Sequence, residues 1–166
     1  MTRRLRRVAL PTLLTGLAFV SVNNVPAGDE KALIGSYMLT QRVTLDGKPL
    51  EGPEVVGFMT FTKTYRTVIM KWNGPGAEPV SIAFIAAYTL SGGKYCESVV
   101  YGVQSNLGAP GVSYDTPSDT KACTAAISDA SGLAFDVPGE KLRLRVSRDA
   151  IDATTPRWND HWEKVK

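Results

Sequence analysis

The chain of 166 residues offers few side chains that could act as nucleophiles or metal ligands. His161 is the one histidine, and Cys96 and Cys123 are the two cysteines. Any Ser–His–Asp or Cys–His arrangement would have to recruit His161, close to the C-terminus. A zinc site commonly takes four ligands, and paired cysteines would leave too few. We predict no catalytic residues, no metal and no cofactor. Haem ligation by His161 is a disfavoured alternative, and a surface or rim position is favoured.

Glu97 is the carboxylate whose surroundings could give it a function. In a strand it shares one face with Tyr95, Val99, Tyr101 and Val103, because side chains alternate between faces. If that face points inward, Glu97 is a buried group that must be hydrogen-bonded, and it could orient a ligand or transfer a proton. If the face points outward, Glu97 is an ordinary solvated residue. We favour the outward orientation and keep the inward one open.

Aromatic and methionine side chains could either fill the core of the domain or line a cavity. Packed on one another, they need no function. Around a hollow, they would form an apolar wall with a few tyrosine hydroxyls, suited to a lipid, an aromatic compound or another hydrophobic metabolite. Core packing is the safer interpretation of any single member. The set comprises Phe58, Met59, Phe61, Met70, Trp72, Phe84, Tyr88 and Tyr101.

The two cysteines have two interpretations. In an oxidising compartment an even pair predicts one disulfide, Cys96–Cys123, closing a loop of about 28 residues. Alternatively, Cys96 is a small buried residue of a strand, reduced and inert. We favour the disulfide.

The N-terminus is typical of a cleavable secretion signal. Four arginines between Arg3 and Arg7 precede an uncharged, mainly apolar run, Val8 to Val22. That run of about 15 residues is shorter than the roughly 20 that span a bilayer. Small residues at Val25-Pro26-Ala27 predict cleavage after Ala27. We therefore expect residues 1–27 to be a signal peptide and residues 28–166 a single periplasmic or secreted domain, exported by either the general or the twin-arginine route.

The charge of the chain does not indicate a nucleic-acid partner. The formal net charge is +3, but four of the 19 basic residues belong to the predicted signal peptide. The remainder holds 15 basic and 16 acidic residues, and no Lys/Arg cluster. A surface that follows phosphates normally needs such a cluster. We predict no nucleic-acid partner and no integral membrane segment in the mature chain, and the oligomeric state stays open.

Alternation of apolar and polar residues predicts β-strands along most of the chain. Asp46-Gly47, Lys63-Thr64, Ser91-Gly92-Gly93 and Asp129 to Gly132 read as turns, and Gln104 to Thr120 as a long loop that could cover a barrel mouth. About eight strands in successive hairpins must stack as two sheets or close into a barrel, and closure removes exposed edges. The expected strands are Leu33 to Leu45, Val55 to Thr62, Tyr65 to Trp72, Val80 to Leu90, Lys94 to Val103, Ala122 to Ser128, Leu133 to Val137 and Lys141 to Ser147, followed by an extended piece or short helix from Arg157 to Val165.

The first strand carries a motif, Gly35-Ser36-Tyr37, that resembles the Gly-x-Trp signature of lipocalins, with Tyr37 in place of tryptophan. The segments 57–62, 84–95 and 160–165 resemble bacterial lipocalin-like domains of the calycin type. The resemblance implies an all-β, antiparallel, up-and-down barrel of about eight strands around a cavity, and a late-strand arginine covering the aromatic residue, for which Arg143, Arg145 and Arg157 are candidates. The cavity candidates are Tyr37, Phe58, Phe61, Met70, Phe84, Tyr88, Glu97 and Tyr101.

Three functions remain open from the residues. The favoured one is an exported module that binds a small hydrophobic molecule inside the barrel, since the sequence offers no covalent chemistry. The second is a structural or protein-interaction barrel with a filled interior and no ligand. The least favoured is a small barrel isomerase or cyclase in which Glu97 or a tyrosine transfers a proton.

Overall fold

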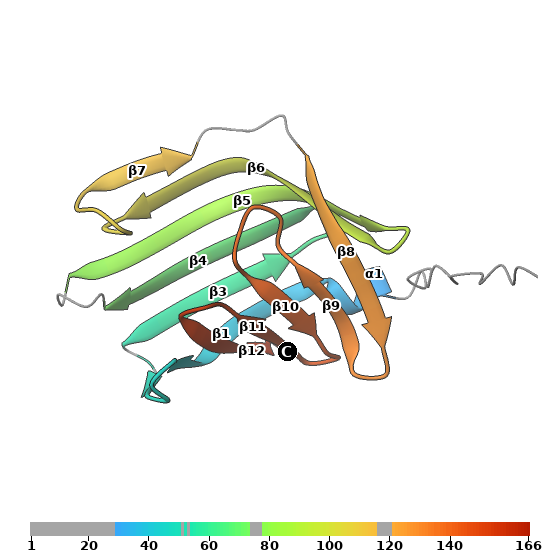
Figure 1. The fold of residues 1–166 in the computed structure, drawn as a ribbon, viewed down its shortest axis with the longest axis horizontal. Helices are drawn as coiled ribbons and strands as arrows, with labels where there is room; N and C mark the ends of the chain where they lie inside the picture. Colours follow the sequence, from blue (N-terminus) through green and yellow to red (C-terminus); the bar gives the residue numbers. More distant parts are fainter. Residues whose placement is uncertain (1–28, 51, 53, 74–77, 116–120) are drawn as a thin grey trace, which may run out of the picture.

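The computed structural model describes residues 29–50, 52, 54–73, 78–115 and 121–166. The predicted signal peptide, residues 1–27, lies outside the described residues. A short helix, α1 (Asp29–Leu33), leads into an antiparallel sheet (Figure 1). The strands are β1 (Gly35–Thr44), β2 (Pro49–Leu50), β3 (Val55–Phe61), β4 (Tyr65–Asn73), β5 (Pro79–Ser91), β6 (Lys94–Ser105), β7 (Val112–Asp115), β8 (Ala122–Asp129), β9 (Gly132–Asp136), β10 (Arg143–Val146), β11 (Ala150–Thr154) and β12 (Trp158–Lys164).

Ten of these strands close into a barrel. Their order is β1, β3, β4, β5, β6, β8, β9, β10, β11 and β12, and β12 pairs back onto β1. The closing register runs from Tyr37 opposite Lys164 to Thr44 opposite Trp158. β2 and β7 lie outside the closed ring, paired to β1 and β6. The predicted all-β, up-and-down barrel is confirmed, and each strand of the ring pairs with a neighbour on both sides.

The barrel has ten strands rather than the expected eight or so. The missed strand is β11, where buried Ile151 and Ala153 alternate with exposed Asp152 and Thr154. Alanine and aspartate have low β propensity, so this short alternation gave only a weak signal. The piece expected to be extended or helical is strand β12, pairing with both β11 and β1.

The predicted loop from Gln104 to Thr120 is also partly strand. Gln104 and Ser105 extend β6, and β7 folds back on that end of β6 with Tyr114 opposite Val103. The described part of the segment is therefore a hairpin added to the barrel wall. The sequence of β7, Val-Ser-Tyr-Asp, alternates over only four residues, all of them exposed, so the strand signal was too short to stand out from the loop.

The turn between β5 and β6 follows its sequence. Gly92 and Gly93 both have positive φ, 57° and 71°. A two-residue hairpin of this kind needs positive φ at both central positions, and glycine adopts it without steric cost. The two glycines of this turn therefore set the pairing register of β5 and β6, the two longest strands of the barrel.

One end of the barrel interior is filled by aromatic rings. Tyr37, Phe61, Tyr88, Tyr95 and Phe135 form a chain across it, with neighbouring ring centroids 4.1 to 6.5 Å apart. All five side chains are buried. Edge-to-face and stacked ring pairs add to the stability gained by burying their apolar area.

The Gly35-x-Tyr37 motif closes the same end. The Lys164 stem passes where a side chain on Gly35 would lie, and its Nζ is 5.5 Å from the centroid of the Tyr37 ring. The Tyr37 hydroxyl donates a hydrogen bond to the Leu33 carbonyl oxygen at 3.1 Å, tying α1 to β1. The cation over the aromatic residue is thus a lysine of β12, not Arg143, Arg145 or Arg157.

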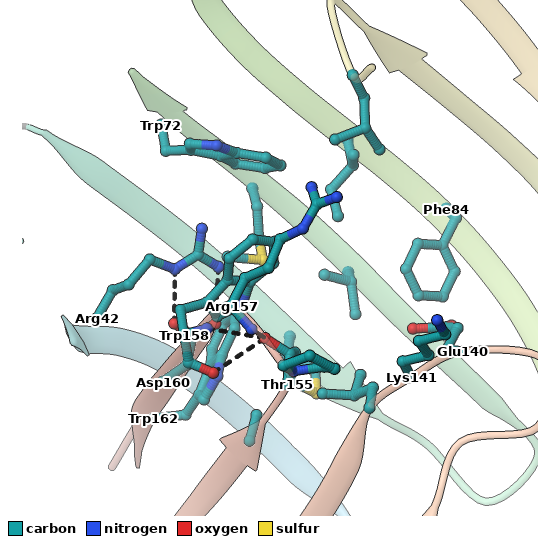
Figure 2. Close-up of a pocket in the computed structure, with 18 of the residues that line it drawn as sticks. Arg42, Trp72, Phe84, Glu140, Lys141, Thr155, Arg157, Trp158, Asp160 and Trp162 are labelled. Atoms are coloured by element: carbon teal, nitrogen blue, oxygen red, sulfur yellow. Dashed lines mark hydrogen bonds and ion pairs between the residues drawn. The ribbon is translucent and has the colours of Figure 1, made fainter. Parts of the chain in front are cut away.

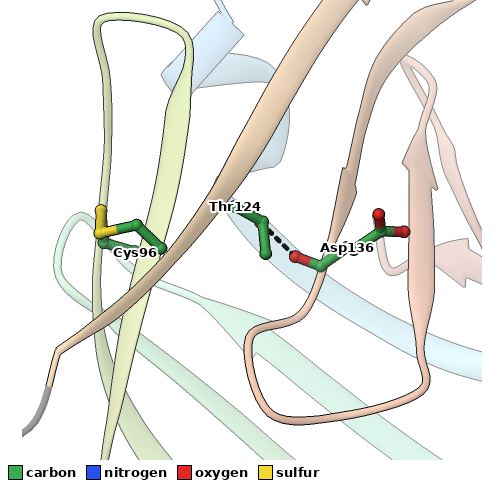
Figure 3. Close-up of a disulfide and its surroundings, with 4 residues drawn as sticks. Cys96, Thr124 and Asp136 are labelled. Atoms are coloured by element: carbon green, nitrogen blue, oxygen red, sulfur yellow. Dashed lines mark hydrogen bonds between the residues drawn. A yellow bond between two sulfur atoms is a disulfide. The ribbon is translucent and has the colours of Figure 1, made fainter.

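The predicted disulfide is present. Cys96 on β6 and Cys123 on β8 are direct cross-strand partners, joined by a bond that spans 27 positions (Figure 3). β6 and β8 pair over four residue pairs, and the disulfide adds a covalent link within that short junction. Among the described residues no helix is long and apolar enough to cross a membrane.

Replacing both cysteines should lower the free energy of unfolding. On the chain-entropy account, opening a loop of this length costs about 3–4 kcal/mol. Urea unfolding of Cys96→Ala/Cys123→Ala measures the loss. A reducing agent should destabilise the wild type by a similar amount and leave the double variant unchanged. Equal stability of all samples would contradict a structural role for the bond.

Alkaline pH should destabilise the fold through Tyr37. Burial, with a smaller contribution from Asp149, raises the pKa of Tyr37 to about 12. Because the unfolded tyrosine ionises near pH 10, its contribution to stability is present below pH 10 and is lost as pH rises toward 12. Tyr37→Phe should flatten the decline of stability between these values. Unchanged pH dependence in this variant would show that Tyr37 titrates normally.

Candidate functional site

The barrel interior contains a cavity of about 530 Å³ beyond its aromatic end. Strands β1, β3, β4 and β5 supply one side of its wall, and β11, β12 and the turns before β10 and β12 supply the other (Figure 2). Exposed residues, among them Leu107 and Pro156, form its mouth. The lining is mainly apolar and comprises Arg42, Met59, Arg66, Val68, Met70, Trp72, Ile82, Phe84, Leu107, Gly108, Glu140, Lys141, Leu142, Ala153, Thr155, Pro156, Arg157, Trp158, Asp160 and Trp162.

A buried ion pair forms one part of this wall. Arg42 on β1 donates from Nε and Nη2 to the two carboxylate oxygens of Asp160 on β12, at 2.6 and 2.8 Å. The guanidinium also lies 5.1 Å from the ring centroid of Trp72 and 4.4 Å from that of Trp158 (Figure 2). The two-pronged hydrogen bonding and the aromatic faces hold the planar group in one orientation. The pair also joins the two strands that close the barrel.

A second buried arginine lies between the cavity and the aromatic end. Arg66 on β4 donates to both carboxylate oxygens of Glu97 on β6, at 3.0 and 2.7 Å, and to Glu140 at 2.9 Å. Its guanidinium carbon is 4.6 Å from the centroid of Phe84. The Tyr95 hydroxyl donates to Glu97 as well. This cluster gives the buried charges their partners, as low-dielectric surroundings require.

Burial shifts the proton equilibria of these groups. Burial alone lowers the pKa of Arg66, and the charges of Glu97 and Glu140 outweigh it and raise the pKa above its usual value. Burial raises the pKa of the Tyr95 hydroxyl, and nearby Glu97 adds to the rise. Burial also raises the pKa of Asp160, opposed by the hydrogen bonds and charge of Arg42. Arg66 therefore stays charged and Tyr95 stays protonated at neutral pH.

Three of the eight cavity candidates line a cavity, and so do Met59 and Trp72 of the aromatic and methionine set. Met70 and Phe84 belong to the main cavity. Glu97 is 5% exposed and lines a smaller adjoining recess, which shares Ile82, Phe84, Leu107 and Glu140 with the main cavity. The favoured outward orientation of Glu97 was wrong. The carboxylate can face inward because Arg66, far away in the sequence, supplies its counter-charge.

Phe58 and Tyr101 lie on the outside of the barrel, 37% and 49% exposed, so neither is a cavity residue. Phe58 alternates with buried Gly57 and Met59, which fixes it outward. Tyr101 faces outward because β6 carries a bulge: Ile85 pairs with Tyr101 and Ala86 with Val99, so one residue of β6 is skipped. An inserted residue reverses the alternation, and the face shared with Glu97 ends there.

Tyr37, Phe61 and Tyr88 are buried in the aromatic chain at the filled end, outside the lining of the cavity. They pack together, which is the core interpretation offered for this set. His161 is hydrogen-bonded at 2.7 Å to Asp152, and both side chains are substantially exposed. No group of three or more potential metal ligands occurs among the described residues.

Sequence reasoning missed the charged residues of the cavity, Arg42, Arg66 and Asp160. Arg66 and Asp160 occupy inward positions of alternating strands: in β4 the buried residues are Arg66, Val68 and Met70. That periodicity was available in the sequence. Arg42 breaks the alternation of Tyr37 and Leu39, because the register of β1 shifts between Leu39 and Gln41. It was overlooked because a charged residue is almost never fully buried unless it is paired, and the pairing partners lie on other strands.

Trp162 was also missed. It is 1% exposed, lines the cavity, and rests on Gly57 so closely that an added Cβ would lie 2.7 Å from its ring. Its Nε1 is the one buried side-chain nitrogen or oxygen without a hydrogen-bond partner among the described residues.

Comparisons of the chain with protein families, curated proteins and solved structures find no match to any of them. The description of the site therefore depends on its own residues.

Removing the Arg66 charge should cost far more stability than removing an exposed one. Arg66→Met leaves Glu97 buried without a counter-charge and should lower the free energy of unfolding by about 3–5 kcal/mol. Arg143→Met, at an exposed ion pair with Asp136, should cost at most about 1 kcal/mol. Urea unfolding measures both losses.

The double variant Arg66→Met/Glu97→Gln should recover much of the loss, since it removes the unpaired charge and keeps an acceptor for the Tyr95 hydroxyl. A double variant as unstable as Arg66→Met would mean that the lost packing of the arginine, not its charge, dominates.

Proposed function

We propose that the protein binds one small, mainly hydrophobic molecule inside its barrel. The observation that carries the proposal is the cavity of about 530 Å³, which lies within the size range of small-molecule sites. Met59, Val68, Met70 and Ile82 present an apolar surface, and Phe84 and Trp72 present aromatic ones. Rigid strands on both sides hold this wall, so a ligand would meet a preformed site.

The interior of the barrel favours ligand binding over the two alternatives, a filled scaffold and a small barrel isomerase or cyclase. A barrel that serves only as a scaffold can fill its interior with side chains, as the aromatic end of this barrel does. An isomerase or cyclase based on Glu97 would need that carboxylate free to take a proton. Arg66 engages both of its oxygens and Tyr95 donates to one of them, so the carboxylate is held as the partner of a buried charge.

One observation favours a protein-interaction role. Met38, Phe58 and Ile69 are direct cross-strand partners on β1, β3 and β4 and form an exposed apolar row on the outer wall, each more than a third exposed. Apolar surface of this kind often marks an interface. We regard this role as the second candidate, compatible with a ligand inside.

The proposed setting is the periplasm or the extracellular space. The disulfide fits an oxidising compartment, and the predicted signal peptide, residues 1–27, would deliver the chain there. The proposed relationship is to lipocalin-like proteins of the calycin type. The closed barrel, the Gly35-x-Tyr37 motif and the cation over Tyr37 support it, and the ten strands depart from it.

A fluorescent fatty-acid analogue should bind at about one equivalent and raise the melting temperature, because a ligand that binds only the folded state stabilises it. Ile82→Trp, which places a large ring in the cavity, should weaken binding by about tenfold or more. Fluorescence titration and thermal unfolding measure the two effects.

Ile85→Trp is the matched control, since Ile85 is the same residue type on the same strand but is 39% exposed on the outer face. It should bind as the wild type does. No binding of the analogue to the wild type, or equal binding to a folded Ile82→Trp variant, would refute a ligand site in the cavity.

A further inference from the structure

The charged side chains around the cavity differ in whether they have partners. Asp160 is paired with Arg42, and Glu97 and Glu140 share Arg66. These contacts engage both carboxylates of the main cavity. The adjoining recess adds Asp115, an exposed residue of β7. Inside the main cavity Arg42 neutralises Asp160, whereas Arg66 faces two carboxylates, so one negative charge is left in excess on the partly exposed Glu140.

Two cations of the same lining, Arg157 and Lys141, have no ion-pair partner among the described residues. Both are exposed residues at the cavity mouth. Glu97 and Glu140 place two negative charges around the single positive charge of Arg66, so that cluster keeps one negative charge in excess. Lys141 follows Glu140 in the chain, and its positive charge offsets this excess. Arg157 has no such neighbour, and in the view of Figure 2 its guanidinium reaches over the space between Trp72 and Phe84.

The apolar wall and the unpaired cation lie at opposite ends of one space. Met59 and Val68 are buried deep in the lining, while Arg157 belongs to the turn between β11 and β12 at the mouth. A guanidinium binds carboxylates and phosphates through parallel N–H donors, and partial shielding from water strengthens that attraction. A molecule with an apolar body and an anionic end would satisfy both regions at once.

We propose that the cavity takes an anionic amphiphile, with the apolar body inside the barrel and the anionic head on Arg157, assisted by Lys141. This proposal rests on the function proposed above and specifies its ligand class. Asp115 lines the adjoining recess and not the main cavity. Its negative charge would repel an anionic head from the recess, so the ligand is expected to bind with its head toward Arg157.

Probes with one tail and different heads test the charge preference. Dodecanoate should bind about fivefold or more tightly than dodecan-1-ol, and dodecyltrimethylammonium should bind more weakly than the alcohol. Isothermal titration below the micellar concentration measures all three, and the preference should shrink as salt is added. Dodecyl phosphate, titrated in parallel, shows whether a carboxylate or a phosphate head is held more tightly.

Variants of the cation locate the head. Arg157→Gln should remove most of the difference between dodecanoate and the alcohol, because it should weaken binding of dodecanoate far more than binding of the alcohol. Arg157→Lys should keep part of the difference, and Arg157→Gln/Lys141→Gln should abolish it. Arg148→Gln, an equal charge change at an exposed residue outside the cavity lining, should have no effect.

The possible failures are distinguishable. If none of the dodecyl probes binds, the proposed ligand-binding function fails. If the alcohol binds as tightly as dodecanoate, or the trimethylammonium probe binds most tightly, ligand binding stands and the anionic head is refuted. A preference for dodecanoate that survives in Arg157→Gln/Lys141→Gln refutes the assignment to these two residues.

Discussion

Two buried arginines organise the interior of this barrel. Arg42 and Arg66 are 3% and 1% exposed, and a charge at such depth is tolerated only with good counter-charges and hydrogen bonds. Asp160 and Glu97 provide both in two-pronged geometry. Arg42 pairs with Asp160 across the seam between β1 and β12, so that pair is satisfied only when the barrel is closed. Arg66 and Glu97 meet across β5, which pairs with both of their strands.

The arginines also divide the interior into two parts. On one side, Tyr95 donates to Glu97 and begins the chain of aromatic rings that fills the barrel as far as Tyr37 and α1. On the other side, the planar guanidinium groups lie against Trp72, Trp158 and Phe84, which belong to the cavity wall. Polar pairs of this type fix one packing arrangement more than they add stability, and here they border an apolar hollow instead of filling it.

The functional interpretation follows from that division. A barrel packed with aromatic rings along its whole length would be a scaffold, whereas this one keeps space beside its buried charges. Glu97 lines the adjoining recess, and because Arg66 engages both of its carboxylate oxygens it is the structural partner of a buried charge. The cations left without partners lie at the mouth, so the electrostatics of the site depend on Arg157 and Lys141 more than on the buried groups.

The sequence by itself determined the local features: the alternating strands, the Gly92-Gly93 hairpin, the cysteine pair and the all-β class, with two stacked sheets and a closed barrel both left open. Each depends on neighbouring residues, on a turn that only glycine adopts easily, or on a simple count. Only the tertiary structure decided which faces point inward. Glu97 faces in because Arg66, two strands away on β4, meets it, and Tyr101 faces out because a bulge in β6 reverses the alternation. Both causes are pairings between strands, and a single strand's pattern contains no information about its partner.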